Sequence, residues 1–108
     1  MSVALIYRLR GAPPEQAETV PVATAEVFRD HWLPGARALG LVWLPLFETG
    51  VKVGVDDLPA VVEELRALER WLAGKAPESV ALVGSRIARL IDVLESLPPL
   101  QDGHAFIG

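Results

Sequence analysis

The chain contains no cysteine, which excludes disulfide bonds and thiolate chemistry of any kind. It has no apolar run that approaches the roughly 18 residues of a membrane-spanning helix, so a membrane is excluded as a partner. The short apolar stretch at the N-terminus is followed, rather than preceded, by Arg8 and Arg10, which is the wrong order for a signal peptide. These absences predict a cytoplasmic protein.

The chain also lacks an excess of basic residues. Its formal net charge is −4; residues 1–55 carry five basic and five acidic side chains, whereas residues 56–108 carry five basic and nine acidic ones. Nucleic-acid binding needs a basic face, so nucleic acid is excluded as a partner. The acidic half is typical of solvated helices, and it would also suit a basic protein as partner.

Asparagine is absent, arginine outnumbers lysine eight to two, and glycine and proline are plentiful, a pattern of GC-rich codons that predicts a bacterial protein. Of the 108 residues, 51% are hydrophobic, and the mean hydropathy of +0.33 is high for so short a chain. A small fold has a large surface for each residue that it buries. We therefore expect a single α+β domain over residues 1–108, with apolar surface left over for a second copy.

The N-terminal third predicts a strand, a loop and a helix. Apolar residues alternate over 2–10, with Arg8, Arg10 and Ile6 on one face of the strand. A loop over 11–18 follows, and residues 20–22 extend only briefly because Pro21 permits an edge position at most. Thr24 is a helix N-cap for residues 25–33, and Pro34 breaks or kinks that helix.

Seven apolar residues, 41–47 (LVWLPLF), precede the pair Thr49-Gly50. A two-residue turn ending in glycine is typical of a tight hairpin, so residues 41–48 and 51–55 are interpreted as its two strands. Pro45 cannot donate to a strand ladder and favours an edge position or a bulge.

The C-terminal half predicts two amphipathic helices from apolar residues at helical spacing: one begins after the N-cap candidates Asp56 and Asp57 and stops at Gly74, and the other spans 78–97. An alternative makes 79–83 a strand, but the apolar stripe stays in phase across Gly84 and favours the helix. The tail resembles a strand, and Phe106 and Ile107 are expected to dock as an edge strand of this sheet or of a neighbouring subunit. The order β-α-β-β-α-α with a C-terminal strand predicts an α+β fold: a small antiparallel sheet with helices packed on one face.

No nucleophile, base and orienting group stand together in the sequence, and no metal-ligand or phosphate-loop spacing is present. No catalytic residue, metal ligand or cofactor is therefore predicted. The ligand-binding candidates are Arg8, Asp30, His31 and His104, since histidine beside carboxylate can bind a metal or transfer a proton. The competing interpretation is that both histidines are structural.

The leading hypothesis is a non-catalytic protein-interaction domain, a homodimer, and in one specific form an inhibitor or immunity-type partner of a basic protein. Its interface residues are taken from the apolar run and the tail: Leu41, Trp43, Phe47, Phe106 and Ile107. The alternative is a small enzyme or ligand-binding domain with a pocket near His31, Asp30 and Arg8.

Overall fold

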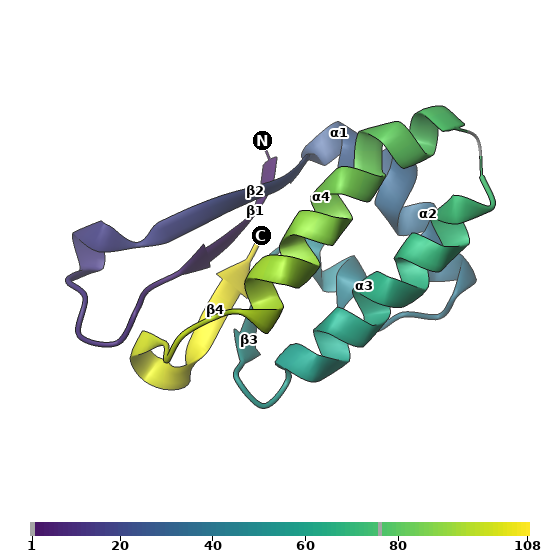
Figure 1. Cartoon of the computed structure of the whole chain (residues 1–108). Helices are drawn as coiled ribbons and strands as arrows, with labels where there is room; N and C mark the ends of the chain where they lie inside the picture. Colours follow the sequence, from purple (N-terminus) through teal and green to yellow (C-terminus); the bar gives the residue numbers. More distant parts are fainter. Residues whose placement is uncertain (1, 76) are drawn as a thin grey trace.

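The computed structural model of the chain describes the backbone of residues 2–75 and 77–108, and the side chains of these residues apart from 77–80 and 82. Helices lie on one face of a four-stranded antiparallel sheet with the order β2-β1-β4-β3, so the predicted α+β class is confirmed (Figure 1). The strands and helices are β1 (Ser2–Tyr7), β2 (Glu18–Thr24), α1 (Ala25–Val27), α2 (Leu33–Ala38), β3 (Val51–Gly54), α3 (Leu58–Ala73), α4 (Pro77–Glu95) and β4 (His104–Ile107).

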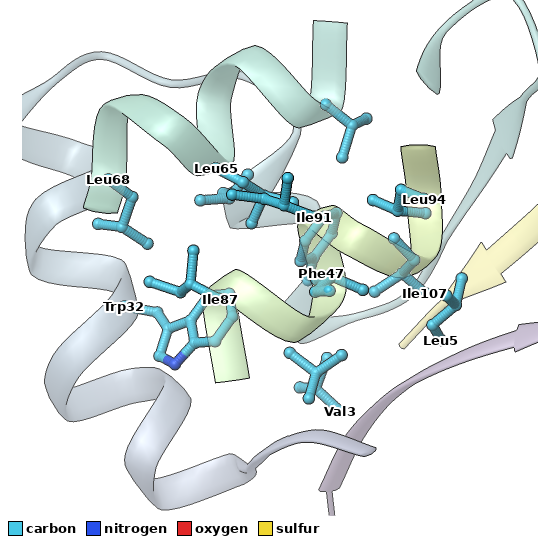
Figure 2. Close-up of a cluster of buried hydrophobic side chains, with 14 of the residues drawn as sticks. Val3, Leu5, Trp32, Phe47, Leu65, Leu68, Ile87, Ile91, Leu94 and Ile107 are labelled. Atoms are coloured by element: carbon cyan, nitrogen blue, oxygen red, sulfur yellow. The ribbon is translucent and has the colours of Figure 1, made fainter. Parts of the chain in front are cut away.

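The core lies between the sheet and the helices. Alternate residues of β1, such as Val3 and Leu5, point inward and are buried, as the alternation in the sequence predicts. Figure 2 shows them facing side chains of α3 and α4, among them Leu65, Ile91 and Leu94. No polar or charged residue among those described is buried, so the core is held by apolar packing alone.

Both long helices are confirmed. Helix α4 runs without interruption from Pro77 to Glu95, so the residues for which a strand was the alternative are helical. It packs against α3, and Arg66 Nη2 lies 2.7 Å from Glu95 Oε1 across the pair. Both side chains of this ion pair are about half exposed, so it contributes little to stability.

Of the two expectations for Pro34, a break or a kink, the break is wrong. The chain stays helical through α1, a π-helical segment (Phe28–Trp32) and α2. The N–H of Leu33 donates to the carbonyl of Phe28, five residues back. This one-residue bulge accommodates Pro34, which has no N–H to donate and whose ring would clash with the carbonyl of a regular α-helix.

The predicted hairpin across Thr49-Gly50 is wrong. Strand β3 exists, but its partner is β4, and residues 44–48 form a 3₁₀-helix (Leu44–Glu48). Proline is well suited to the first turn of a helix, where Pro45 stands, because no N–H is required there. Leu44 and Phe47, three residues apart, then fall on one side of the 3₁₀-helix and are both buried.

The tail forms a strand, as predicted, but in the interior of the sheet and not at its edge. Ile107 pairs with Leu5 of β1 on one side and with Val51 of β3 on the other, and it is fully buried. The turn before it has Asp102 at φ 61° and Gly103 at φ 72°, the left-handed conformation that Asp and Gly adopt more readily than other residues.

Helices α2 and α3 approach closely at Gly35. A methyl group added there would lie 2.5 Å from Leu68 Cδ1 and 2.7 Å from Trp71 Cε3. We expect Gly35→Ala to lower the free energy of unfolding by about 1–3 kcal/mol through overpacking, despite the better helix propensity of alanine. Urea denaturation measures this. Gly74→Ala is the matched control, since its nearest new contact is 3.7 Å away, and a Gly35→Ala variant as stable as this control would contradict the prediction.

Candidate functional site

The outer face of the sheet, turned away from the helices, carries a row of four side chains, one from each strand. Its two central members are apolar, and it is called the apolar row here. Pairing places Lys52 of β3 beside Phe106 of β4, Phe106 beside Ile6 of β1, and Ile6 beside Thr19 of β2. Ile6 and Phe106 keep 36% and 37% of their surface exposed. The row therefore offers two large apolar side chains at its centre, with a lysine at one edge and a threonine at the other.

One end of the outer face is flat because glycines flank the Phe106 ring. A methyl group on Gly50 would lie 2.6 Å from Phe106 Cζ, and one on Gly108 would lie 2.9 Å from Phe106 Cε1. Gly50 also has φ 101°, a conformation that other residues rarely adopt. Ala4 and Gly108 exchange backbone hydrogen bonds of 3.2 and 3.0 Å, so the small residues beside the Phe106 ring continue onto β1.

The other end of the outer face is polar and holds a small hollow of about 190 Å³, which Arg8, Asp102 and His104 line with Ile6 and Phe106. Arg8 Nη2 lies 3.6 Å from Asp102 Oδ2. Two of the four predicted ligand-binding residues, Arg8 and His104, are thus brought to one place. Asp102 already balances the Arg8 charge, which reduces its attraction for an anionic ligand.

Asp30 and His31 do not line this hollow. They belong to the π-helical segment, which is part of the helical layer on the inner side of the sheet. Asp30 is exposed and His31 is half-buried. The structure therefore does not bring the pair together with Arg8 in the way that the predicted pocket requires.

A second apolar surface, here called the 39–46 segment, follows α2. Leu39, Val42 and Leu46 are 40%, 68% and 42% exposed, and Leu41 and Trp43 are half-buried. Gly50 contacts both regions: its N–H donates to the Leu46 carbonyl at 2.9 Å, and the Phe106 ring lies against it.

Two of the five predicted interface residues are not exposed on the surface of the chain. Phe47 and Ile107 are fully buried in the core of this chain, so their place in the interface set is corrected. Leu41, Trp43 and Phe106 keep partial exposure, and their interface role stays a prediction.

Glu64 holds the 39–46 segment in place. Its carboxylate accepts hydrogen bonds from the backbone N–H groups of Val42 at 3.0 Å, Trp43 at 2.9 Å and Leu44 at 3.1 Å. These are the free N–H groups at the start of the 3₁₀-helix, which the glutamate caps from a distance of some twenty residues in sequence. The residues next to Glu64 in sequence do not indicate these partners, which belong to a distant part of the chain.

Within the described residues, no group of three or more histidine, aspartate or glutamate side chains is placed to hold a metal ion. None of the helices described is both long and apolar enough to cross a membrane. No protein-family model, no curated protein and no solved structure matches the chain.

The Glu64 cap generates a test. We expect Glu64→Gln to lower the free energy of unfolding by about 1–3 kcal/mol, because an amide supplies one acceptor oxygen and turns a donor NH₂ toward backbone N–H groups. Hydrogen exchange at the amides of Val42, Trp43 and Leu44 will accelerate. Glu63→Gln, one residue away and exposed, is the control, and equal effects of the two substitutions would refute the capping role.

Proposed function

We propose that this chain is a non-catalytic protein-interaction domain of bacterial type that works as a homodimer. The observation that carries the proposal is where the apolar surface lies. Of the six large hydrophobic side chains that are well exposed in the described part of the chain, five belong to the outer face or to the 39–46 segment: Ile6, Leu39, Val42, Leu46 and Phe106. These side chains form two patches, one on the outer face and one on the 39–46 segment beside α3, and exposed apolar patches are typical of interaction sites.

The row on the outer face favours a second copy of the chain as occupant. Two sheets pack face to face about 10 Å apart when inner side chains interdigitate. With a twofold axis parallel to the strands and between β1 and β4, Phe106 of each copy lies over Ile6 of the other. The same axis sets each Lys52 against Thr19 of the other copy, so the two lysines do not meet.

The sheet edges support a face-to-face arrangement over an edge-to-edge one. Strand β3 is only four residues long and carries Lys52. Strand β2 contains Pro21, and a bulge interrupts its pairing with β1 between Val3 and Ala4. Short strands, lysine, proline and bulges all discourage a further strand from adding to a sheet edge.

The alternative, a ligand-binding domain, draws support from the convergence of Arg8 and His104 on the small hollow. The ion pair between Arg8 and Asp102 weakens that support. We therefore favour the homodimer over the ligand-binding domain, and we propose that it acts in the cytoplasm.

Light scattering tests the dimer. At micromolar concentration we expect a mass twice the 11.7 kDa of the chain. Ile6→Glu puts a charge at the centre of the apolar row and is expected to give a monomer with an unchanged far-UV circular dichroism spectrum. Val55→Glu, the same change at an exposed position away from the outer face, is expected to remain a dimer. A monomeric parent chain, or dissociation by both variants alike, would overturn the proposal.

A further inference from the structure

The sixth exposed apolar side chain, Val55 at 47% exposure, lies apart from the outer face and marks a different surface. It lines a groove of about 470 Å³ between the first turns of α3 and the end of α4. The floor of this groove is apolar and is formed by Val55, Leu58, Pro59, Val62 and Leu94. The groove belongs to the helical layer, so a dimer through the outer face leaves it open.

The rim of the groove is acidic. Glu63 and Glu95 line it, and the only basic residue among the eight that do so, Arg66, already pairs with Glu95 at 2.7 Å. Two further carboxylates are close in sequence: Asp56 and Asp57 stand between the lining residues Val55 and Leu58, and both are exposed. Asp92 is exposed one helical turn before Glu95, on the same side of α4.

The charge of the rim decides between occupants. A second copy of the chain would bring two acidic rims together, which like-charge repulsion opposes. A partner segment that carries an apolar side chain between lysines or arginines would instead bury its apolar part against the floor and meet carboxylates at the rim. Such a partner also agrees with the distribution of charge, since the net charge of −4 arises entirely from residues 56–108.

We infer that the groove between α3 and α4 binds a basic, apolar-centred segment of another protein. This inference rests on the proposed role as an interaction domain, but not on the dimer, because the two surfaces share no residue. The apolar floor supplies the affinity, and the carboxylates supply the selectivity for a cationic partner and an association rate that falls with salt.

The test uses a fluorescein-labelled amphipathic peptide of leucine and lysine and measures fluorescence anisotropy with the full chain. Val55→Lys places in the groove a positive charge that repels the lysines of the peptide, and it is expected to weaken peptide binding about tenfold. Ala73→Lys adds the same charge at an exposed apolar position at the opposite end of α3 and is expected to change the affinity by about twofold at most. Equal weakening by both variants would mean that the peptide follows net charge alone, and would overturn the inference.

Two further readings make the result specific. On binding the peptide, the backbone amide signals of Val55, Leu58 and Val62 in a ¹⁵N correlation spectrum are expected to shift, whereas shifts confined to the outer face would contradict the inference. A control peptide with glutamate in place of lysine is expected not to bind, and its binding with similar affinity would exclude the role of the acidic rim.

The Ile6→Glu variant separates this inference from the dimer. If the parent chain is monomeric while Val55→Lys still weakens peptide binding selectively, the dimer proposal is wrong and the inference about the groove is upheld. If Ile6→Glu gives a monomer that has lost the peptide as well, the groove is not the binding site and the inference fails.

Discussion

The fold depends on the insertion of β4 between β1 and β3. These two strands are about fifty residues apart in sequence, and in the sheet order β2-β1-β4-β3 only the last few residues of the chain connect them. Ile107 pairs with Leu5 on one side and Val51 on the other, and its side chain enters the core. Because an unpaired backbone group inside a sheet is costly, loss of this strand would separate β3 from β1 and expose the core beneath them.

The same insertion creates the outer face. Side chains alternate along a strand, so burial of Ile107 directs Phe106 to the opposite side, where it meets Ile6. Gly50 and Gly108 are then required beside the Phe106 ring, since a methyl group on either would collide with it. Sheet closure and the proposed interaction surface are therefore two consequences of one strand.

The elements with strong local periodicity were predictable from the sequence. β1, α3 and α4 each bury one regular stripe, and such a stripe needs no knowledge of distant partners. The partner of β3 was not predictable in this way. A hairpin across Thr49-Gly50 was predicted, but β3 pairs with β4, which lies about fifty residues further along the chain. Apolar content alone also did not distinguish a strand at 41–48 from a 3₁₀-helix, in which Leu44 and Phe47 bury together and Glu64 supplies the missing acceptors.

The candidate site was also predictable only in part. Arg8 and Ile6 share a strand face as their spacing predicts, and both line the hollow on the outer face. The pair Phe106 and Ile107 was assigned to one interface, although neighbours in a strand must point to opposite faces, so that at most one of them could lie there.

Charge separates the two proposed surfaces of the molecule. The apolar row on the outer face has no carboxylate among its four residues, whereas acidic side chains surround the groove between α3 and α4. A row with a single lysine can pair with its own copy when the twofold axis keeps the two lysines apart, while a groove with an excess of carboxylates repels its own copy and favours a partner of the opposite sign. Because the groove lies in the helical layer and the apolar row on the uncovered face of the sheet, occupation of one surface leaves the other accessible (Figure 1). A dimer of this kind would present two acidic grooves, and a partner with two basic segments would gain affinity from binding both at once.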